Sequence, residues 1–130
     1  MIIDTSALVA ILRDEPDAAR YAEAIAAAGD CRISAATYVE TAAAIDGARD
    51  PIASRRLDEL FREAGITIEP VTATQARIAR QAYRDFGKGS GHAARLNFGD
   101  CFAYALAAER GEAILFKGED FARTDLACAL

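Results

Sequence analysis

Four short apolar segments that alternate with helical stretches constrain the fold of this 130-residue chain more than any other feature. The segments are residues 1–3, 31–34, 66–71 and 113–116, and a short fifth one is expected around 126–129. Parallel strands need helical crossovers between them, so this alternation predicts a mostly parallel sheet of four to five strands. We therefore expect an α/β/α sandwich, formed by a single domain that spans residues 1–130.

Capping residues and helix formers mark the helices between these segments. Ser34 stands where a side chain would cap a helix, Pro51 opens a second helix, and Thr72 starts a third. Two further helices are expected over residues 7–12 and 18–28, and a last one over 97–108. The helix that begins at Thr72 is expected to bury an apolar stripe made of Ala76, Ala79, Tyr83 and Phe86.

Composition argues against a disordered chain and against a membrane protein. Hydrophobic residues make up 52% of the sequence, no apolar run reaches the length of a membrane span, and no basic leader precedes the first strand. The three cysteines form no CxxC pair and lie in apolar contexts, and His92 is too isolated for a zinc site. We expect a soluble, cytoplasmic protein. His92 is expected to be a loop residue without catalytic duty, with contact to a substrate phosphate as the alternative.

Four acidic residues stand apart from the rest of the chain: Asp4, Glu40, Asp100 and Asp120. Asp4 and Asp120 follow predicted strands, and ligands of parallel sheets bind beyond the carboxyl ends of the strands. Two carboxylates about 5 Å apart repel by about 3 kcal/mol at an effective dielectric of roughly 20, so a cluster of four requires a cation or bound protons. Oxygen ligands without a nearby His or Cys indicate Mg²⁺ or Mn²⁺.

Each of these acids, taken alone, also has a structural explanation. Asp4 would cap a helix, Asp100 would favour a helix dipole, and Asp120 would sit in a turn. Glu40 would be a solvated helix position, but it has no salt-bridge partner at short helical spacing. That all four explanations hold together is the less favoured interpretation.

The chain resembles the PIN-domain family, in particular its VapC-type toxins of bacterial toxin–antitoxin pairs. Four blocks that together cover essentially the whole chain carry the resemblance: residues 1–12 (MIIDTSALVAIL), 34–40 (SAATYVE), 96–107 (LNFGDCFAYALA) and 115–125 (LFKGEDFARTD). The first and third blocks are specific, whereas the block with Glu40 is weak by itself. The resemblance implies a PIN-like fold and a metal-dependent endoribonuclease that cleaves RNA phosphodiester bonds.

The resemblance also implies roles for particular residues and partners. The four acids would hold one or two divalent ions, Mg²⁺ or Mn²⁺, with Asp4 and Asp100 as direct ligands. Ser6, Thr5 and Asn97 would support the acids or contact the substrate. Within the fourth block Asp120 is preferred over Glu119, with Asp125 in reserve. A VapB-like antitoxin and a homodimer are the expected protein partners.

The charge of the chain is unevenly distributed. Its net charge is −5, yet residues 75–95 carry five basic residues against the single acid Asp85: Arg77, Arg80, Arg84, Lys88 and Arg95. Such a basic island beside an acidic pocket predicts an RNA track, because Arg and Lys position a phosphate backbone without reading sequence. Lys88 and Arg95 are the better substrate candidates, since Arg77 and Arg80 would serve equally well on a solvated helix face.

Two other functions remain as alternatives. A phosphatase of the haloacid dehalogenase type also begins with a strand that ends in Asp, but it needs a second Asp where this chain has Ser6. A PIN-like module that only binds partners would not need all four acids. A flavodoxin-like nucleotide binder is weaker still, because no GxGxxG motif or P-loop follows any predicted strand.

Overall fold

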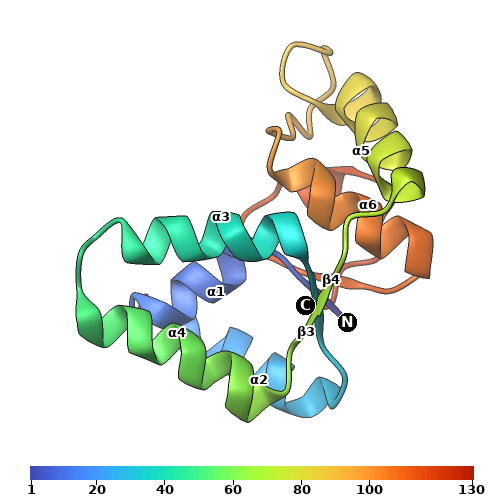
Figure 1. Ribbon diagram of the computed structural model, residues 1–130. Helices are drawn as coiled ribbons and strands as arrows, with labels where there is room; N and C mark the ends of the chain where they lie inside the picture. Colours follow the sequence, from blue (N-terminus) through green and yellow to red (C-terminus); the bar gives the residue numbers. More distant parts are fainter.

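The computed structural model describes residues 1–130 and contains one four-stranded sheet, in which every pairing is parallel (Figure 1). The strands are β1 Ile2–Ile3, β2 Arg32–Ser34, β3 Thr67–Glu69 and β4 Ile114–Leu115. Their order across the sheet is β3-β2-β1-β4, so the first strand lies in the interior of the sheet. The predicted parallel sheet is confirmed, with four strands.

The fifth strand that was expected around residues 126–129 does not form. An isolated bridge joins Ile114 to Cys128, with Ala129 N–H donating to the Ile114 carbonyl at 2.9 Å. The third strand is also shorter than residues 66–71, because Pro70 has no N–H to continue a ladder. The sheet therefore ends at β3 on one side and at β4 on the other.

Six helices connect and cover the strands: α1 Thr5–Leu12, α2 Ala18–Ala28, α3 Ala35–Asp46, α4 Pro51–Ala64, α5 Ala73–Phe86 and α6 Asp100–Arg110. The Ser34 hydroxyl accepts the Ala36 N–H at the start of α3, and the Thr72 hydroxyl accepts the Gln75 N–H at the start of α5. The sequence predicted the Ser34 cap and a helix that starts at Thr72. None of the helices combines the length and apolar character needed to cross a bilayer.

Adjacent residues of the central strands point to opposite faces of the sheet, as the period of a strand requires. Ile2 and Ile114 pack with α5 and α6, whereas Ile3 and Leu115 pack with α1 and α2. Figure 1 shows the result: α5 and α6 lie on one side of the strands, and α1, α2, α3 and α4 gather on the other. This arrangement confirms the predicted α/β/α sandwich.

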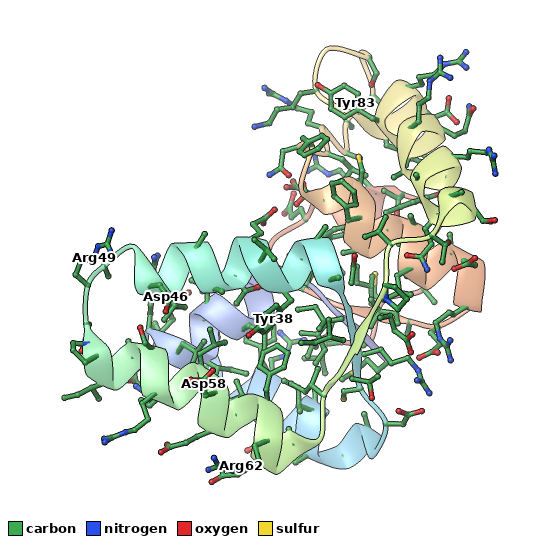
Figure 2. The ribbon with its side chains drawn as sticks, in the orientation of Figure 1. Tyr38, Asp46, Arg49, Asp58, Arg62 and Tyr83 are labelled. Atoms are coloured by element: carbon green, nitrogen blue, oxygen red, sulfur yellow. The ribbon has the colours of Figure 1, made fainter.

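Helices α3 and α4 close the larger layer through side chains that face each other. Tyr38 of α3 makes an edge-on contact with Phe61 of α4, with ring centroids 5.1 Å apart, and Figure 2 shows Tyr38 directed into the space between the two helices. Leu12, Ile45 and Leu57 form a small buried cluster further along the same layer. This packing holds the α3 backbone in place and thereby fixes the position of Glu40.

The buried face of α5 differs from the predicted stripe. Ala79 and Phe86 pack into the core as expected, and Ala82 joins them. Ala76 and Tyr83 instead face outward, and the Tyr83 side chain is visible near the end of α5 in Figure 2. Helix α6 also begins three residues later than predicted, at Asp100, because residues 97–99 form a turn before the helix.

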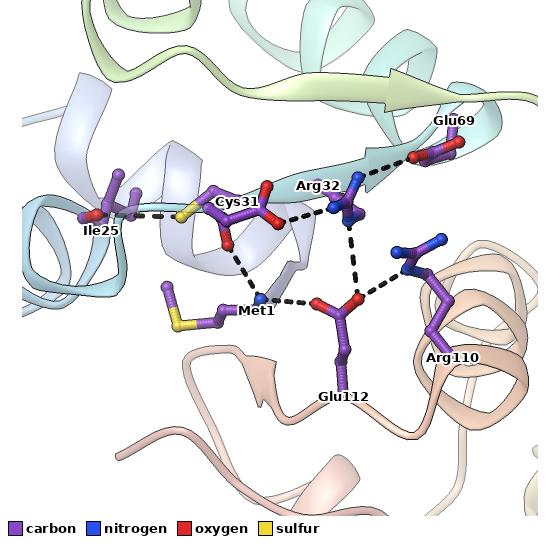
Figure 3. Close-up of polar contacts among 8 residues, drawn as sticks. Met1, Ile25, Cys31, Arg32, Glu69, Arg110 and Glu112 are labelled. Atoms are coloured by element: carbon purple, nitrogen blue, oxygen red, sulfur yellow. Dashed lines mark hydrogen bonds and ion pairs between the residues drawn. The ribbon is translucent and has the colours of Figure 1, made fainter.

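An ionic network joins the segments that precede three of the strands (Figure 3). The Arg32 guanidinium bonds Asp30 at 2.6 Å, and the Met1 amine bonds Glu112 at 2.6 Å. Arg110 also donates to Glu112 at 2.6 Å. Burial alone would raise the pKa of Glu112, but the hydrogen bonds that it accepts from the Met1 amine and from Arg110 hold the pKa at about 2. The carboxylates at this edge of the sheet are therefore neutralised by protein cations.

Candidate active site

Four carboxylates converge at the opposite edge of the sheet, beyond the carboxyl ends of β1 and β4. They belong to Asp4 after β1, Glu40 on α3, Asp100 at the start of α6 and Asp120 after β4, and they line one pocket of about 280 Å³. Thr5, Ser6, Asn97 and Lys117 complete its polar lining. The structure therefore brings together the four acids that were singled out from the sequence.

Asp4 is buried and held in one orientation by Ser6. The Ser6 hydroxyl donates to Asp4 Oδ2 at 2.6 Å, and the Ser6 N–H donates to the same oxygen at 2.9 Å. The Ser6 hydroxyl in turn accepts the Lys117 N–H at 2.9 Å, which ties the start of α1 to the chain after β4. These contacts engage Oδ2 alone, so the other oxygen of Asp4 is available to the pocket.

Asp100 is oriented by a reciprocal pair of hydrogen bonds with Asn97. The Asn97 N–H donates to Asp100 Oδ2, and the Asp100 N–H donates to Asn97 Oδ1, each at 2.9 Å. This is the hydrogen-bond pattern of a capping box, with the two residues three positions apart. Asn97 therefore supports Asp100 directly, and the second carboxylate oxygen of Asp100 carries no hydrogen bond within the protein.

Glu40 reaches the pocket across the surface of Gly99. A β-carbon built on Gly99 would lie 1.7 Å from Glu40 Oε2, far inside van der Waals contact. The Gly99 backbone is in the ordinary right-handed helical region, so the conformation does not demand glycine here. Glycine is needed at position 99 because any side chain there would occupy the space of the Glu40 carboxylate.

The structure separates the three acids of the fourth sequence block. Asp120 lines the pocket. Glu119 forms an ion pair with Arg123, and Asp125 accepts a hydrogen bond from the Tyr104 hydroxyl at 2.6 Å and lines a different hollow. Asp120 is therefore the acid of this block that shares a pocket with Asp4 and Asp100, whereas Asp125 does not.

The pocket lacks a protein cation that would neutralise it. None of its four carboxylates takes part in a salt bridge. Lys117 lines the pocket, but its ammonium is bound to Glu15 and, at 2.8 Å, to Asp17. The one cationic side chain that lines the pocket is thus held by two acids outside it. Sequence reasoning missed this arrangement because Lys117 and its partners lie about a hundred residues apart.

The protonation behaviour of the acids reflects this lack of neutralisation. Burial raises the pKa of Asp100 to about 7, and the charges of Asp4, Asp120 and Glu40 add to the effect. Burial also raises the pKa of Asp4, against the lowering effect of its hydrogen bonds from Ser6. The pKa of Glu40 rises by the same cause. Removing water from a carboxylate disfavours its charged form unless a cation or a donor compensates.

The donor set suits a hard divalent ion. The pocket offers carboxylate oxygens and contains neither His nor Cys, the combination that favours Mg²⁺ or Mn²⁺ over zinc. No three acidic, His or Cys side chains of the chain stand close enough to enclose an ion by themselves. An ion held here would therefore keep part of its water shell, as Mg²⁺ commonly does.

The basic residues that were predicted to contact substrate lie outside the pocket. Lys88 and Arg95 are exposed on the segment between α5 and α6, and neither forms a salt bridge. Arg95 adopts a left-handed backbone conformation with φ of 51°. His92 packs edge-on against Phe86, and its Nδ1 accepts the Ala94 N–H, in keeping with a structural role.

Comparison with known proteins gives one family and several relatives. A family model described as the PIN domain matches residues 1–126. Ribonuclease VapC28 of Mycobacterium tuberculosis is 59% identical over 130 residues, which are 100% of this chain and 98% of that relative. The match is therefore one of whole chains rather than of an isolated motif.

Two solved structures are similar to the fold. VapC20 of Mycobacterium tuberculosis, described as a toxin that cleaves the sarcin–ricin loop, superposes with a TM-score of 0.73 at 18% identity, covering 97% of this chain and 95% of that one. A toxin–antitoxin complex from Klebsiella pneumoniae superposes with a TM-score of 0.67 at 18% identity, covering 93% and 89%. At such identities these structures show a common fold.

Proposed function

The chain belongs to the PIN-domain family, among the VapC ribonucleases, and on that premise we propose that it is a metal-dependent endoribonuclease, the toxin of a toxin–antitoxin pair. Membership confirms the resemblance that four sequence blocks had indicated. The observation that supports the proposed activity most strongly is the pocket itself. Four carboxylates line one pocket beyond the carboxyl ends of β1 and β4, and none of them takes part in a salt bridge.

We assign the four acids to the binding of Mg²⁺, with Mn²⁺ as a substitute. Asp4 and Asp100 present a free carboxylate oxygen each and would bind the ion directly, while Glu40 and Asp120 would bind directly or through water. A divalent ion bound to carboxylates lowers the pKa of an attacking water and offsets charge that develops on the phosphate. Ser6 and Asn97 orient Asp4 and Asp100 respectively, which fixes the direction of the two free oxygens.

The phosphate backbone of RNA would reach this pocket along the basic island. Lys88 and Arg95 are exposed and unpaired, so they can bind phosphate without first breaking an internal ion pair. Contacts of this kind position a strand but do not select its sequence. The phosphodiester to be cut would then lie over the acids, and an ion held by them would offset the repulsion between phosphate and carboxylate.

Protein partners follow from the same family. The Klebsiella structure is a toxin–antitoxin complex, which supports a VapB-like antitoxin for this chain. A guanidinium of the antitoxin would fit the pocket, because it can pair with Asp4 or Asp100 in place of the ion. We also propose a homodimer, to be tested by light scattering at tens of micromolar. A monomer at that concentration would contradict it.

The decisive experiment measures cleavage of single-stranded RNA in Mg²⁺ by the purified protein and by its Asp4→Asn and Asp100→Asn variants. We expect both variants to lose activity by orders of magnitude while their circular dichroism spectra stay those of the wild type. The control is Asp58→Asn, which changes an exposed acid on α4 (Figure 2) that does not line the pocket, and it should cleave normally. Full activity in either pocket variant would refute the proposed site.

The same assay separates the alternatives. A PIN-like module that only binds partners would leave RNA intact with every ion tested. A phosphatase of the haloacid dehalogenase type would phosphorylate Asp4 and would need a second acid at position 6. Here the Ser6 hydroxyl is engaged between Asp4 and Lys117, which argues against that mechanism.

A further inference from the structure

A second hollow, which we call the aromatic groove, lies between α5 and the start of α6. Its volume is about 490 Å³, and its main lining residues are Tyr83, Phe98 and Phe102 together with Arg80 and Arg84. The predicted helix stripe included Tyr83 as a core residue, but the ring forms part of this groove instead. The groove is therefore surface that the folding of the chain does not use.

The aromatic groove and the acidic pocket share one wall. Asn97 and Asp100 line the pocket, while Phe98 and Cys101 line the groove. Along residues 97–101, side chains that line the acidic pocket therefore alternate with side chains that line the aromatic groove. A chain bound with one phosphate over the acids would have its adjacent nucleotide beside Phe98.

Phe98 is a largely exposed aromatic residue that adjoins the acidic pocket. Its exposed fraction is 75%, and that of Tyr83 is 44%. The Phe98 ring stands edge-on to Phe102, with centroids 5.1 Å apart and an interplanar angle of 85°. One face of an aromatic ring at the turn is thus open for another planar group to stack against.

The charges around the groove specify the kind of occupant. Arg80 and Arg84 form no salt bridge, and the one acid of this part of α5, Asp85, is engaged by Gln81 at 3.0 Å. A second copy of the chain docked about a twofold axis that passes through the groove would bring the arginines of both copies together, and their repulsion disfavours such a dimer. Aromatic rings flanked by free guanidinium groups suit a ligand with planar bases and a phosphate backbone.

We propose that the aromatic groove binds a nucleobase of single-stranded RNA next to the phosphate that is cut, with the base stacked on Phe98. The inference rests on the proposed ribonuclease function, since it names a substrate contact of that site. Arg80 and Arg84 hold the phosphates that lead away from the acids. Single-stranded RNA is favoured at this contact, because a paired base must first be unstacked and unpaired before it can stack on a side chain.

The test combines a change in the protein with a change in the RNA. Binding of labelled single-stranded oligonucleotides is measured by fluorescence anisotropy in EDTA, where a metal-dependent enzyme cannot cut. Each oligonucleotide carries one abasic nucleotide at a different position. For the wild type we expect one position at which loss of the base weakens binding roughly 5- to 150-fold, as loss of a stacking contact does.

In Phe98→Ala the same abasic substitution should have less than about a twofold effect, because the stacking partner is already absent. Phe98→Trp should restore the dependence on that base. The control is Ile52→Ala, which removes another exposed apolar side chain, 62% exposed, at the start of α4. It should behave as the wild type does.

Several outcomes would overturn the inference. Equal sensitivity of the wild type and Phe98→Ala to every abasic position would do so, even if both cleave RNA. Light scattering that shows Phe98→Ala to break a dimer, or antitoxin binding lost with RNA binding intact, would assign the groove to a protein partner. If the wild type cleaves no RNA yet shows the base dependence, the proposed function fails and the stacking site stands.

Discussion

The carboxylate of Glu40 occupies the space in which a side chain at position 99 would begin. A β-carbon on Gly99 would lie 1.7 Å from Glu40 Oε2 and 2.7 Å from its carboxyl carbon. Because Glu40 ends a flexible side chain, a substitution at Gly99 would displace the carboxylate rather than the backbone. The two residues, 59 positions apart in sequence, thus form one unit of the acidic pocket.

The first prediction is that Gly99→Ala lowers RNA cleavage tenfold or more with little change in melting temperature. Alanine fits the helical backbone at this position, so the fold should tolerate it. If the change acts through Glu40, adding it to Glu40→Gln should cause no further loss. Additive losses in the double variant would show that Gly99 acts by another route.

The second prediction concerns pH and follows from Asp100. Its pKa in the fold is about 7, above the ordinary 3.8. At pH values well below 3.8 the residue is protonated in both the folded and the unfolded states, so its burial does not lower the free energy of unfolding. As the pH rises toward 7 the unfolded chain loses the proton first, so the folded state loses stability, by a few kcal/mol once both are ionised.

Asp100→Asn removes this titration. We expect the metal-free variant to match the wild type in free energy of unfolding near pH 4 and to exceed it increasingly up to about pH 8. Urea denaturation across this range in EDTA measures the difference. Glu119→Gln, the exposed neighbour of Asp120, is the matched control and should show no such trend. A constant difference between Asp100→Asn and wild type would contradict the burial argument.

The third prediction is that Mg²⁺ stabilises the wild type and that the pocket variants lose this response. An ion that binds only the folded state raises stability in proportion to the logarithm of its concentration. Thermal shifts with millimolar Mg²⁺ at pH 8 should be positive for the wild type and small for Asp4→Asn. If both proteins shift equally, the ion binds elsewhere.

The fourth prediction tests the restraint on Lys117. Changing Glu15→Gln and Asp17→Asn together releases the ammonium, which can then approach the carboxylates of the pocket and compete with the ion. We expect the Mg²⁺ concentration for half-maximal cleavage to rise several-fold. Adding Lys117→Gln should reverse the effect. Asp14→Asn, whose acid pairs with Arg56 instead, is the control and should leave the Mg²⁺ requirement unchanged.

Local sequence signals predicted the parts of the fold that depend on neighbouring residues. The cap at Ser34, the helix start at Thr72 and the alternation of strands and helices required only short-range patterns. The prediction of a fifth strand was wrong because residues 126–129 have a strand-like composition but make only a single bridge to β4. Composition cannot show whether a segment finds a partner over enough residues to form a ladder.

The same distinction separates the predicted and missed features of the site. Asp4, Asp100 and Asp120 were found because each lies beside a recognisable strand or helix boundary. Glu40 lies inside α3 and was found because it has no salt-bridge partner at short helical spacing and matches a block of the family. Gly99, the restraint on Lys117 and the aromatic groove were missed, since each depends on side chains that meet only in three dimensions. Tyr83 shows the limit most clearly: helical spacing grouped it with core residues, but the turn of α5 places it outside.

The two edges of the sheet differ in how their carboxylates are compensated. At one edge the ionic network around Arg32 and Glu112 neutralises them, whereas at the other edge the pocket acids repel one another without a compensating cation. Mutations that remove one of the repelling carboxylates would raise the melting temperature of the metal-free protein and abolish its activity. A screen of random variants for thermal tolerance alone should therefore enrich substitutions of the pocket acids. At the pocket positions, selection for thermal stability should favour neutral residues, whereas selection for activity should favour the acids.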